Sequence, residues 1–586
     1  MRYNTNVMQV LNVTNLKVEF GDYVLFDNVT FSLNDKDRLA LIGPNGMGKS
    51  TIIKVILNQI DKTSGDIAFL KGLTIGYLSQ EVISDVNHTL KEEVLEVFSS
   101  LIKEEEELKL LEEQISLQPD NQKLIDLYGK KQNEFIEKGG YDYHYLIPMM
   151  LSKFCFHEED LDRIITSFSG GERTKMAFVK LLLLKPKLLI LDEPTNHLDI
   201  ATIEWLEKYL KSYEGALLFV SHDRYFIDAL ANKIVEIDNH TSSFYKGNYT
   251  YYVEEKKLRY EQQLNAYNNQ QKEIAKLKRF IEFYKPKPRF VARAKDREKK
   301  LEHMKKIDKP YKNNTSLKIK FTGDVYEGKE ILKLENLTIG YDIPLINNIS
   351  FSLYGKDRIA IMGSNGCGKT TLLEAIINQK HILHGQINYV RQVNVGYIRQ
   401  HQLDMNPENS IIEEMMKEYS SLGEKKLYNH LGKFNFDYDD AHKKIGVLSG
   451  GEKMRVVLAK IILENYDVLL LDEPTNHLDM VTRQGLVLAL NEYQGSIIFV
   501  SHDRYFVDEL ATHLLYIDND TPYFIEGNFM DFKEQESKIL ALSDDLQKKN
   551  KTENKINNQV KKQSKRSPKK LEDLILKTEN DISKLK

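Results

Sequence analysis

The sequence predicts an α/β protein in which one kind of domain occurs twice, and three observations support this prediction. A glycine-rich segment at residues 43–50 returns at 363–370, a displacement of 320 residues. The string Asp-Glu-Pro-Thr-Asn-His-Leu-Asp at 192–199 returns letter for letter at 472–479, a displacement of 280. Each motif follows a short apolar run with the length of a buried strand. Self-similarity of this kind indicates two tandem domains.

The change of displacement from 320 to 280 locates an insertion in the first repeat. This repeat carries 40 extra residues between Gln80 and Ser169. Within them, apolar residues recur at helical spacing from Leu90 onward. The sequence therefore predicts a helical arm at about 84–140. It leaves open whether the arm projects from its domain or packs against it.

A segment between the two repeats has no counterpart in the second half of the chain. It contains apolar residues at helical spacing, among them Ala294 and Met304. The proline-containing run Lys285–Arg289 interrupts this spacing, because proline lacks an amide donor and disfavours helix in the residue before it. We expect two antiparallel helices with a basic tip.

These signals divide the chain into four parts. Residues 1–255 form the first domain, 256–325 a basic helical-hairpin linker, 326–540 the second domain, and 541–586 a basic tail with a short coiled-coil-like helix.

Charge is distributed unevenly along these parts. The whole chain has a formal net charge of −4, yet Lys272–Lys320 carries +12 (18 basic, 6 acidic residues) and Lys548–Lys570 carries +9 (10 basic, 1 acidic). The remaining residues must therefore carry −25. Two basic segments on an otherwise acidic protein indicate attraction to a polyanion.

Composition excludes several other kinds of site. The two cysteines, Cys155 and Cys367, lie far apart, so a disulfide framework or a cysteine-based metal site is not expected. The N-terminus lacks the apolar core of a signal peptide. No apolar run approaches the roughly 20 residues that span a bilayer. We expect a cytoplasmic protein with neither a membrane contact nor a transmembrane partner.

Both glycine-rich segments fit the P-loop pattern, in which glycines let backbone amides turn toward a phosphate at the start of a helix. We expect Lys49 and Lys369 to reach the β- and γ-phosphates of ATP, and Ser50 and Thr370 to bind Mg²⁺. The residues expected to hold the phosphates are Gly43, Pro44, Asn45, Gly46, Met47, Gly48, Lys49, Ser50 and Thr51, and their counterparts Gly363, Ser364, Asn365, Gly366, Cys367, Gly368, Lys369, Thr370 and Thr371.

Two neighbouring acidic residues follow a later apolar strand in each repeat. Asp192 and Asp472 end these strands, where a carboxylate faces the ligand crevice and can hold the Mg²⁺ shell. The next residues, Glu193 and Glu473, are placed to polarise the attacking water as general bases.

Two histidines and several aromatic residues complete the expected site. His222 and His502 also follow strand-like runs, so we expect them to point at the γ-phosphate. Phe20 or Tyr23 and Tyr341 are candidates for the aromatic ring that stacks on adenine, and the sequence does not choose among them.

The order of these motifs resembles the ABC ATPase domain in both halves of the chain. The resemblance implies an α/β fold class with two P-loop ABC nucleotide-binding domains in tandem, joined by an α-helical hairpin linker, with a helical arm insertion in the first domain. In that family a Ser-Gly-Gly segment closes on the ATP held by the opposite domain. By this resemblance, one site combines Lys49, Ser50, Gln80, Asp192, Glu193 and His222 with Ser449, Gly450 and Gly451. The other site combines Lys369, Thr370, Gln400, Asp472, Glu473 and His502 with Ser169, Gly170 and Gly171. The resemblance also implies that Gln80 and Gln400 bind Mg²⁺ partly through water.

A closer resemblance is to the ABC-F family, over about Met8 to Phe532. The Asp-Glu-Pro-Thr-Asn-His-Leu-Asp strings, the linker at Arg289–Met304 and the arm carry it. It implies an ATPase whose ATP-bound closed form binds the ribosomal exit (E) site and acts on P-site tRNA and the peptidyl-transferase centre. The partners implied are ribosomal RNA and tRNA, contacted by the linker and arm.

Two alternatives remain open at this point. Resistance members of the family, which protect ribosomes from antibiotics, often have a longer hairpin tip. The five-residue tip at Lys285–Arg289 favours a factor that regulates or rescues translation. The second alternative is an ABC ATPase that acts on branched DNA through its C-terminal tail.

Overall fold

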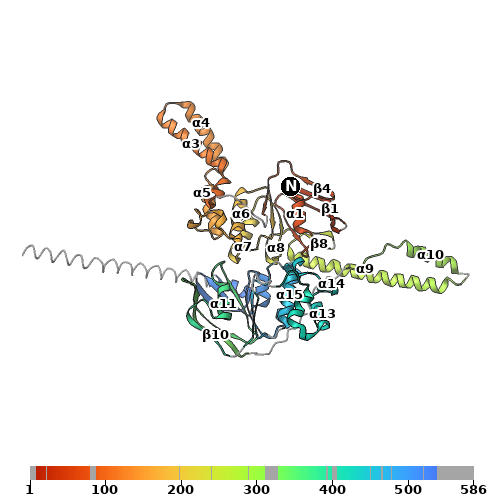
Figure 1. Cartoon of the computed structure of the whole chain (residues 1–586). Coiled ribbons are helices and arrows are strands. Elements are labelled where there is room, and N and C mark those ends of the chain that lie inside the picture. The colour runs from red at the N-terminus through yellow and green to blue at the C-terminus, as the bar shows by residue number, and fades with distance from the viewer. Residues whose placement is uncertain are drawn as a thin grey trace, which may run out of the picture.

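The protein consists of two similar α/β units from which two helical hairpins project in different directions (Figure 1). The computed structural model describes residues 8–21, 23–78, 88–196, 198–238, 240–287, 290–310, 328–390, 393–398, 405–448, 450–463, 466–476, 478–518 and 520–536. The prediction of two tandem domains of one fold is confirmed. We call these units the first and second cassette.

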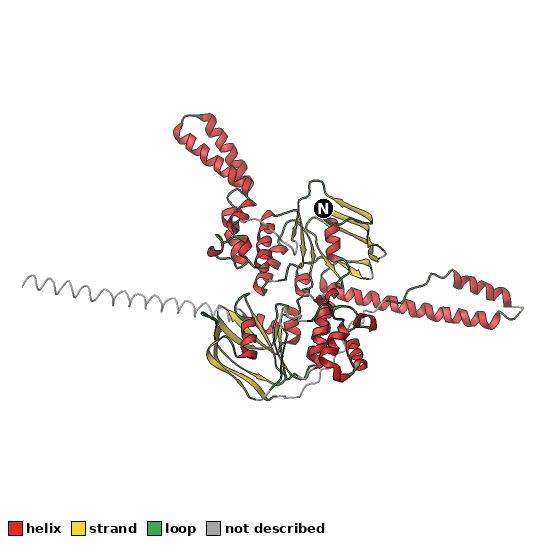
Figure 2. Cartoon of the chain, viewed as in Figure 1, coloured by secondary structure: helices red, strands yellow, loops and turns green. Residues whose placement is uncertain are grey.

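Each cassette contains two sheets (Figure 2). In the first cassette a small antiparallel sheet has the order β2-β1-β4, and a six-stranded sheet has the order β5-β6-β7-β3-β8-β9, parallel except for the β8–β9 pair. The strands are β1 (Gln9–Phe20), β2 (Tyr23–Asn34), β3 (Arg38–Ile42), β4 (Ser64–Phe69), β5 (Ile75–Leu78), β6 (Leu188–Asp192), β7 (Ala216–Val220), β8 (Lys233–Asp238) and β9 (Thr241–Tyr245). The helices of its body are α1 (Lys49–Ile56), α6 (Gly170–Leu184), α7 (Ile200–Lys211) and α8 (Arg224–Leu230).

The second cassette repeats both sheets, with the orders β11-β10-β13 and β14-β15-β16-β12-β17-β18. Its strands are β10 (Glu330–Gly340), β11 (Pro344–Tyr354), β12 (Arg358–Gly363), β13 (Ile382–Tyr389), β14 (Val395–Ile398), β15 (Val468–Asp472), β16 (Ser496–Val500), β17 (His513–Asp518) and β18 (Thr521–Glu526). Its helices are α11 (Lys369–Asn378), α12 (Ile411–Tyr419), α13 (Glu424–Lys433), α14 (Tyr438–Ala441), α15 (Gly450–Leu463), α16 (Met480–Asn491) and α17 (Arg504–Leu510).

The central strands are buried on both faces, which explains their unbroken apolar sequences. In β3, for example, Leu39 and Leu41 pack with the antiparallel sheet and α1, whereas Ala40 and Ile42 pack toward α6, α7 and α8. Because β3, β6 and β7 run parallel, the polar residues that follow them meet at one edge of the sheet.

The insertion in the first cassette forms a projecting arm. It consists of α3 (Ser99–Leu117) and α4 (Gln122–Glu137), whereas the flanking helices α2 (Leu90–Glu96) and α5 (Tyr143–Lys153) have counterparts in the second cassette, α12 and α13. The antiparallel pair α3–α4 extends away from the body (Figure 1). The sequence left open whether the arm projects from its domain or packs against it, and the structure shows that it projects. Ion pairs between the two helices join Lys131 to Glu107 and Lys138 to Glu104, both with an N–O distance of 2.7 Å.

The second projection is the hairpin of α9 (Tyr249–Tyr284) and α10 (Val291–Glu302). Helix α9 begins inside the first cassette, with Asn248 as its N-cap. The expected helical spacing continues to Met304, but α10 ends two residues earlier. The chain then returns extended along α9, where the Gln270 side chain donates to the Lys305 carbonyl and accepts from the Ile307 amide, both at 2.8 Å. The Gln270 side chain of α9 thus pairs with backbone groups that would form hydrogen bonds within the helix if α10 continued.

No helix in the described ranges has the length and apolar character needed to cross a membrane.

Candidate functional site

The two glycine-rich loops connect a central strand to a helix N-terminus in each cassette. Gly48 and Gly368 precede α1 and α11 with φ angles of 84° and 99°, which glycine adopts without strain. The Lys49 ammonium donates to the Gly43 carbonyl at 2.8 Å, and Lys369 does the same to Gly363 at 2.9 Å. The loops therefore hold a cation beside a row of backbone amides, an arrangement suited to phosphate groups.

A carboxylate and a hydroxyl lie beside each loop. In the second cassette the Thr370 hydroxyl donates to Asp472 Oδ2 at 2.9 Å. In the first, Asp192 Oδ1 is buried, with no hydrogen-bond partner among the described residues, and burial raises the pKa of this carboxyl. An oxygen in this position fits a hard cation such as Mg²⁺, which prefers carboxylate and hydroxyl oxygens.

The glutamate that follows each aspartate has an unusual backbone. Glu193 and Glu473 both have φ of 51°, in the left-handed region that costs free energy for a non-glycine residue. Their amides donate to the Val220 and Val500 carbonyls, both at 3.0 Å, so the sheet edge holds this conformation. Burial raises the pKa of Glu193 to about 7 and that of Glu473 to about 8. Carboxylates with such values can take up a proton near neutral pH.

The two histidines lie against these glutamates. The His222 amide donates to Glu193 Oε2 at 3.3 Å, and the His502 amide donates to Glu473 Oε2 at 3.4 Å. Burial lowers the pKa of His222 well below its ordinary value and that of His502 to about 3, so both imidazoles are neutral. A neutral imidazole can donate a hydrogen bond to a phosphate from one ring nitrogen.

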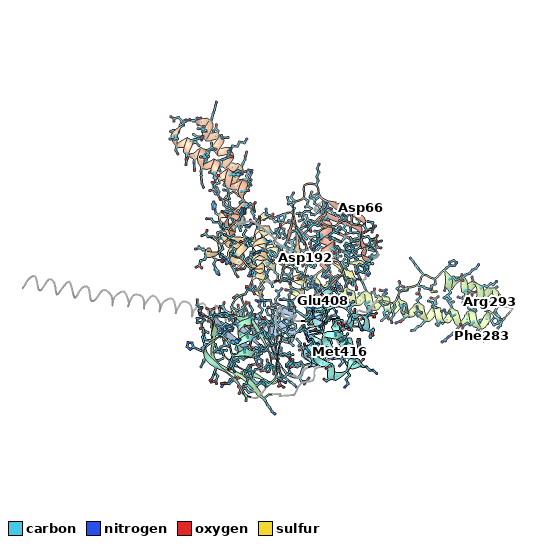
Figure 3. All side chains as sticks on the ribbon, in the orientation of Figure 1. Asp66, Asp192, Phe283, Arg293, Glu408 and Met416 are labelled. Atoms are coloured by element: carbon cyan, nitrogen blue, oxygen red, sulfur yellow. The ribbon has the colours of Figure 1, made fainter. Side chains whose placement is uncertain are left out.

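The surrounding residues enclose two cavities. The first has a volume of 410 Å³ and the second 650 Å³, and each receives residues from both cassettes. Asn45, Gly46, Gly48, Lys49, Ser50, Thr51, Asp192, Glu193 and His222 line the first, and Asn365, Gly366, Gly368, Lys369, Thr370, Thr371, Asp472, Glu473 and His502 line the second, together with Ser169 and Gly171. Asp192 lies close to the boundary between the cassettes (Figure 3).

The remaining predicted residues lie around these cavities or outside the described ranges. Gly43 and Pro44 line a smaller neighbouring cavity, Ser364 accepts from Lys369 at 2.7 Å, and Met47 and Cys367 pack against the hydrophobic cores. Gly170 begins α6, and Gly450 and Gly451 begin α15. Gln80, Gln400, Ser449 and the tail at 541–586 are outside the described residues.

The Ser-Gly-Gly-Glu segment of the first cassette owes its shape to a capping box. Ser169 Oγ accepts from the Glu172 amide at 3.4 Å, and Glu172 Oε2 accepts from the Ser169 amide at 2.8 Å. The box starts α6 beside the second cavity, so the N-terminus of this helix faces the glycine-rich loop of the other cassette.

Among the candidate aromatic residues, only Tyr341 lines either of the two cavities in the described part of the chain. Phe20 and Tyr23 are 54% and 56% exposed. The corresponding wall of the first cavity contains Leu25, whose counterpart Leu345 lies in the second.

Two further residues in the sites were not predicted from the sequence. Asp479 Oδ2 accepts from the Asn45 amide of the opposite cassette at 3.1 Å. Arg483 lines both cavities. The sequence contains one indication that Arg483 has a special role: the two repeats differ at this position, where the first has Ile203.

Comparison with protein families and with known proteins gives consistent matches. A family model described as "ABC transporter" matches residues 26–196 and 346–476, and another with the same description matches 235–321. The chain is 39% identical to the ATP-binding protein YdiF of Bacillus subtilis (91% of this chain, 84% of that one). It is 33% identical to ABC transporter F family member 2 of Arabidopsis thaliana (89% and 80%). It is also 33% identical to the energy-dependent translational throttle protein EttA of Haemophilus influenzae (88% and 93%).

Solved structures share the fold at lower identity. The RNase-L inhibitor matches with a TM-score of 0.56 and 18% identity, over 88% of this chain and 90% of that one. A chain in a model of ribosome-bound archaeal Pelota and ABCE1 also matches with 0.56, at 19% identity, over 88% and 78%.

Proposed function

Because the chain belongs to the ABC-F family and is an ATPase with two ABC cassettes, we propose that it is an ATP-driven switch on the ribosome. Its ATP-bound closed form binds the ribosomal exit (E) site and acts on P-site tRNA and the peptidyl-transferase centre. In this way it regulates or rescues translation, and hydrolysis releases it. The observation that carries this proposal is the basic hairpin, which joins two cassettes with complete sets of catalytic groups.

The residues of the two cavities support ATP hydrolysis at both. Lys49 and Lys369 are placed to bind the β- and γ-phosphates, and the neutral histidine of each site can donate to the γ-phosphate. Glu193 and Glu473 orient the attacking water and take up its proton. Mg²⁺, held by Ser50 and Asp192 in one site and Thr370 and Asp472 in the other, would neutralise negative charge on the phosphates.

The boundary between the cassettes supports a switch. Closing the cassettes completes each cavity with residues of the opposite one, such as Ser169 in the cavity that contains Lys369. ATP between the two surfaces therefore stabilises the closed form, because it binds that form with more contacts than it binds the open one. Loss of the γ-phosphate removes part of these contacts.

The hairpin has the chemistry of an RNA contact. Its basic residues suit a phosphate backbone, to which lysine and arginine give affinity without reading sequence. Phe283 is 59% exposed, and the Lys287 ammonium lies 3.5 Å from the centre of its ring. Phe283 and Arg293 both lie near the outer end of the hairpin (Figure 3), far from the ATP sites. An exposed ring beside cations can stack on an unpaired base.

The test is co-sedimentation of the Glu193→Gln/Glu473→Gln double variant with ribosomes, with and without ATP. Removing both general bases leaves ATP bound and the closed form trapped, so we expect the variant to pellet only when ATP is present. A matched variant with Lys49→Ala and Lys369→Ala added should stay in the supernatant. Failure to pellet with ATP, together with retention on branched DNA, would overturn the proposal in favour of a DNA-directed ATPase.

A further variant tests the hairpin itself. Reversing Arg293 and Lys287 to Glu in the trapped protein should lower ribosome binding and weaken its dependence on salt concentration. Reversing two exposed lysines of the first cassette outside the arm, Lys71 and Lys208, gives a control with the same change of net charge. An equal loss in both variants would mean that net charge, rather than the hairpin, governs binding.

A further inference from the structure

The two ATP sites differ at one buried position. Arg483 lies in the first turn of α16 and is 9% exposed. The equivalent position of the first cassette, in α7, is Ile203. A guanidinium has five N–H donors and an isoleucine side chain has none, so the two cassettes cannot make the same contacts here.

Arg483 connects the histidine segments of both sites. Its Nη1 donates to the His222 carbonyl of the opposite cassette at 3.2 Å and to Asp503 Oδ2 of its own cassette at 2.8 Å. Its Nε donates to the Leu478 carbonyl at 3.0 Å, which fixes the start of the side chain. The guanidinium therefore lies between the two cavities and contributes to the wall of each.

The contact with His222 reaches the catalytic groups of the first site. The amide of the same residue donates to Glu193 Oε2, and its Nε2 lies 3.1 Å from Asn45 Oδ1 in the glycine-rich loop. A hydrogen bond to the His222 carbonyl thus restrains a backbone segment that holds both the general base and the loop. It can form only when the second cassette is in place, since Arg483 comes from that cassette.

We propose that Arg483 is a positioning residue that makes hydrolysis at the first site depend on closure of the cassettes, and that the two sites are consequently not equivalent. At the second site Ile203 cannot hold the His502 carbonyl in this way. The proposal rests on the ATPase activity and is independent of any ribosomal role.

A difference in charge alone does not explain the asymmetry. The second cavity also receives a cation from the opposite cassette, Lys175 of α6. Both sites therefore have positive charge from across the boundary. The distinguishing feature is the hydrogen bond from Arg483 to the backbone of the histidine segment.

The test measures each site separately. Glu473→Gln leaves only the first site able to hydrolyse ATP, and Glu193→Gln leaves only the second. Adding Arg483→Ile should lower kcat in the Glu473→Gln protein by about tenfold, the loss expected for one positioning hydrogen bond. The loss in the Glu193→Gln protein should be several-fold smaller. Equal losses in both backgrounds would overturn the proposal.

Further variants separate positioning from folding and from charge. Arg483→Ile leaves the Asp503 carboxylate without its partner, so Arg483→Ile/Asp503→Asn removes the unpaired charge and should show the same selective loss of kcat. A purely structural role predicts that this double variant recovers activity in both backgrounds, which would contradict the proposal. Arg483→Lys retains a donor and should restore part of kcat at the first site, with little change in KM for ATP. No restoration, or a change confined to KM, would also contradict it.

Discussion

Arg504 and Asp223 form a buried ion pair across the boundary between the cassettes, with Nη2 2.9 Å from Oδ2. The same nitrogen lies 2.5 Å from Glu207 Oε1, so one guanidinium of the second cassette serves two carboxylates of the first. The equivalent residue, Arg224, reaches the other way and donates to the Met480 carbonyl at 3.4 Å. The boundary is therefore symmetric in its sequence motifs but not in its electrostatics.

Arg504→Ala should weaken the closed form far more than Arg224→Ala. The first change leaves the buried Asp223 and the half-buried Glu207 without their cation, which costs about 3 kcal/mol or more. The second removes two long hydrogen bonds, to Met480 and Gln484, and a cation–π contact with Tyr505, together worth about 1 kcal/mol. Calorimetric unfolding of the ATP-trapped Glu193→Gln/Glu473→Gln protein measures both effects. Equal losses would mean that the buried pair stabilises the closed form no more than the contacts of Arg224 do.

A cluster at the base of the arm should control how firmly the arm is held. Glu105 is buried and accepts from the Tyr143 hydroxyl, and Lys109 Nζ lies 2.9 Å from Glu105 Oε1. These hydrogen bonds lower the pKa of Glu105 to about 2. The stability that this group provides is therefore present above its ordinary pKa of 4.5 and is lost as the pH falls toward 2.

Glu105→Ala should accordingly speed hydrogen exchange of α3 and α4 at neutral pH, because Tyr143 loses its buried partner. ATPase activity should be retained, since the arm lies away from both cavities. Glu112→Ala, which removes an exposed partner of Tyr128 in the same hairpin, is the matched control. Similar exchange in both variants would show that Glu105 does not hold the arm.

Much of the fold could be predicted because its determinants are local. The strand before Gly43 and the helix after it carry their own apolar patterns, and the same pattern recurs 320 residues later. The Ser-Gly-Gly-Glu segment likewise encodes its own capping box. Such features depend on residues that are close in the sequence, so they can be recognised in a single amino-acid sequence before the structure is known.

The sequence could not predict what depends on packing between distant parts. The direction of the arm depends on how its base packs against the cassette. The roles of Arg483 and Asp479 exist only because the second cassette lies against His222 and Asn45 of the first. The extended segment after α10 likewise forms two hydrogen bonds with Gln270, a residue of the other helix.

Replacing Glu193 and Glu473, the two proposed general bases, by glutamine should stabilise the ATP-free protein. Because burial raises their pKa values to about 7 and 8, the folded state keeps protons that the unfolded state loses above pH 4.5. Stability therefore falls as the pH rises through this range. Glu193→Gln/Glu473→Gln removes that cost, so its gain over the wild type should reach about 1 kcal/mol or more at pH 8 and be small at pH 5. Thermal unfolding at both pH values checks this, with Glu112→Gln as an exposed control.

The same two carboxyls should give the two sites different pH profiles. A general base acts only when it has lost its proton, so kcat/KM at each site should rise with pH through the pKa of its glutamate in the free enzyme. Burial raises both pKa values and the lysine of each site, Lys49 or Lys369, lowers them, but Arg483 lowers that of Glu193 further, which leaves it at about 7 against about 8 for Glu473. The Glu473→Gln protein, which retains Glu193, should therefore reach half of its maximal kcat/KM about one pH unit below the Glu193→Gln protein.

Steady-state phosphate release between pH 6 and 9, at constant ionic strength, measures these profiles. The double glutamine variant provides the background to subtract, because it keeps both cavities and lacks both bases. Coincident midpoints would show that the two glutamates have the same pKa in the free enzyme or that a step other than proton abstraction limits kcat/KM at both sites. A single-turnover experiment separates these two causes, because it measures the hydrolysis step apart from ATP binding and product release.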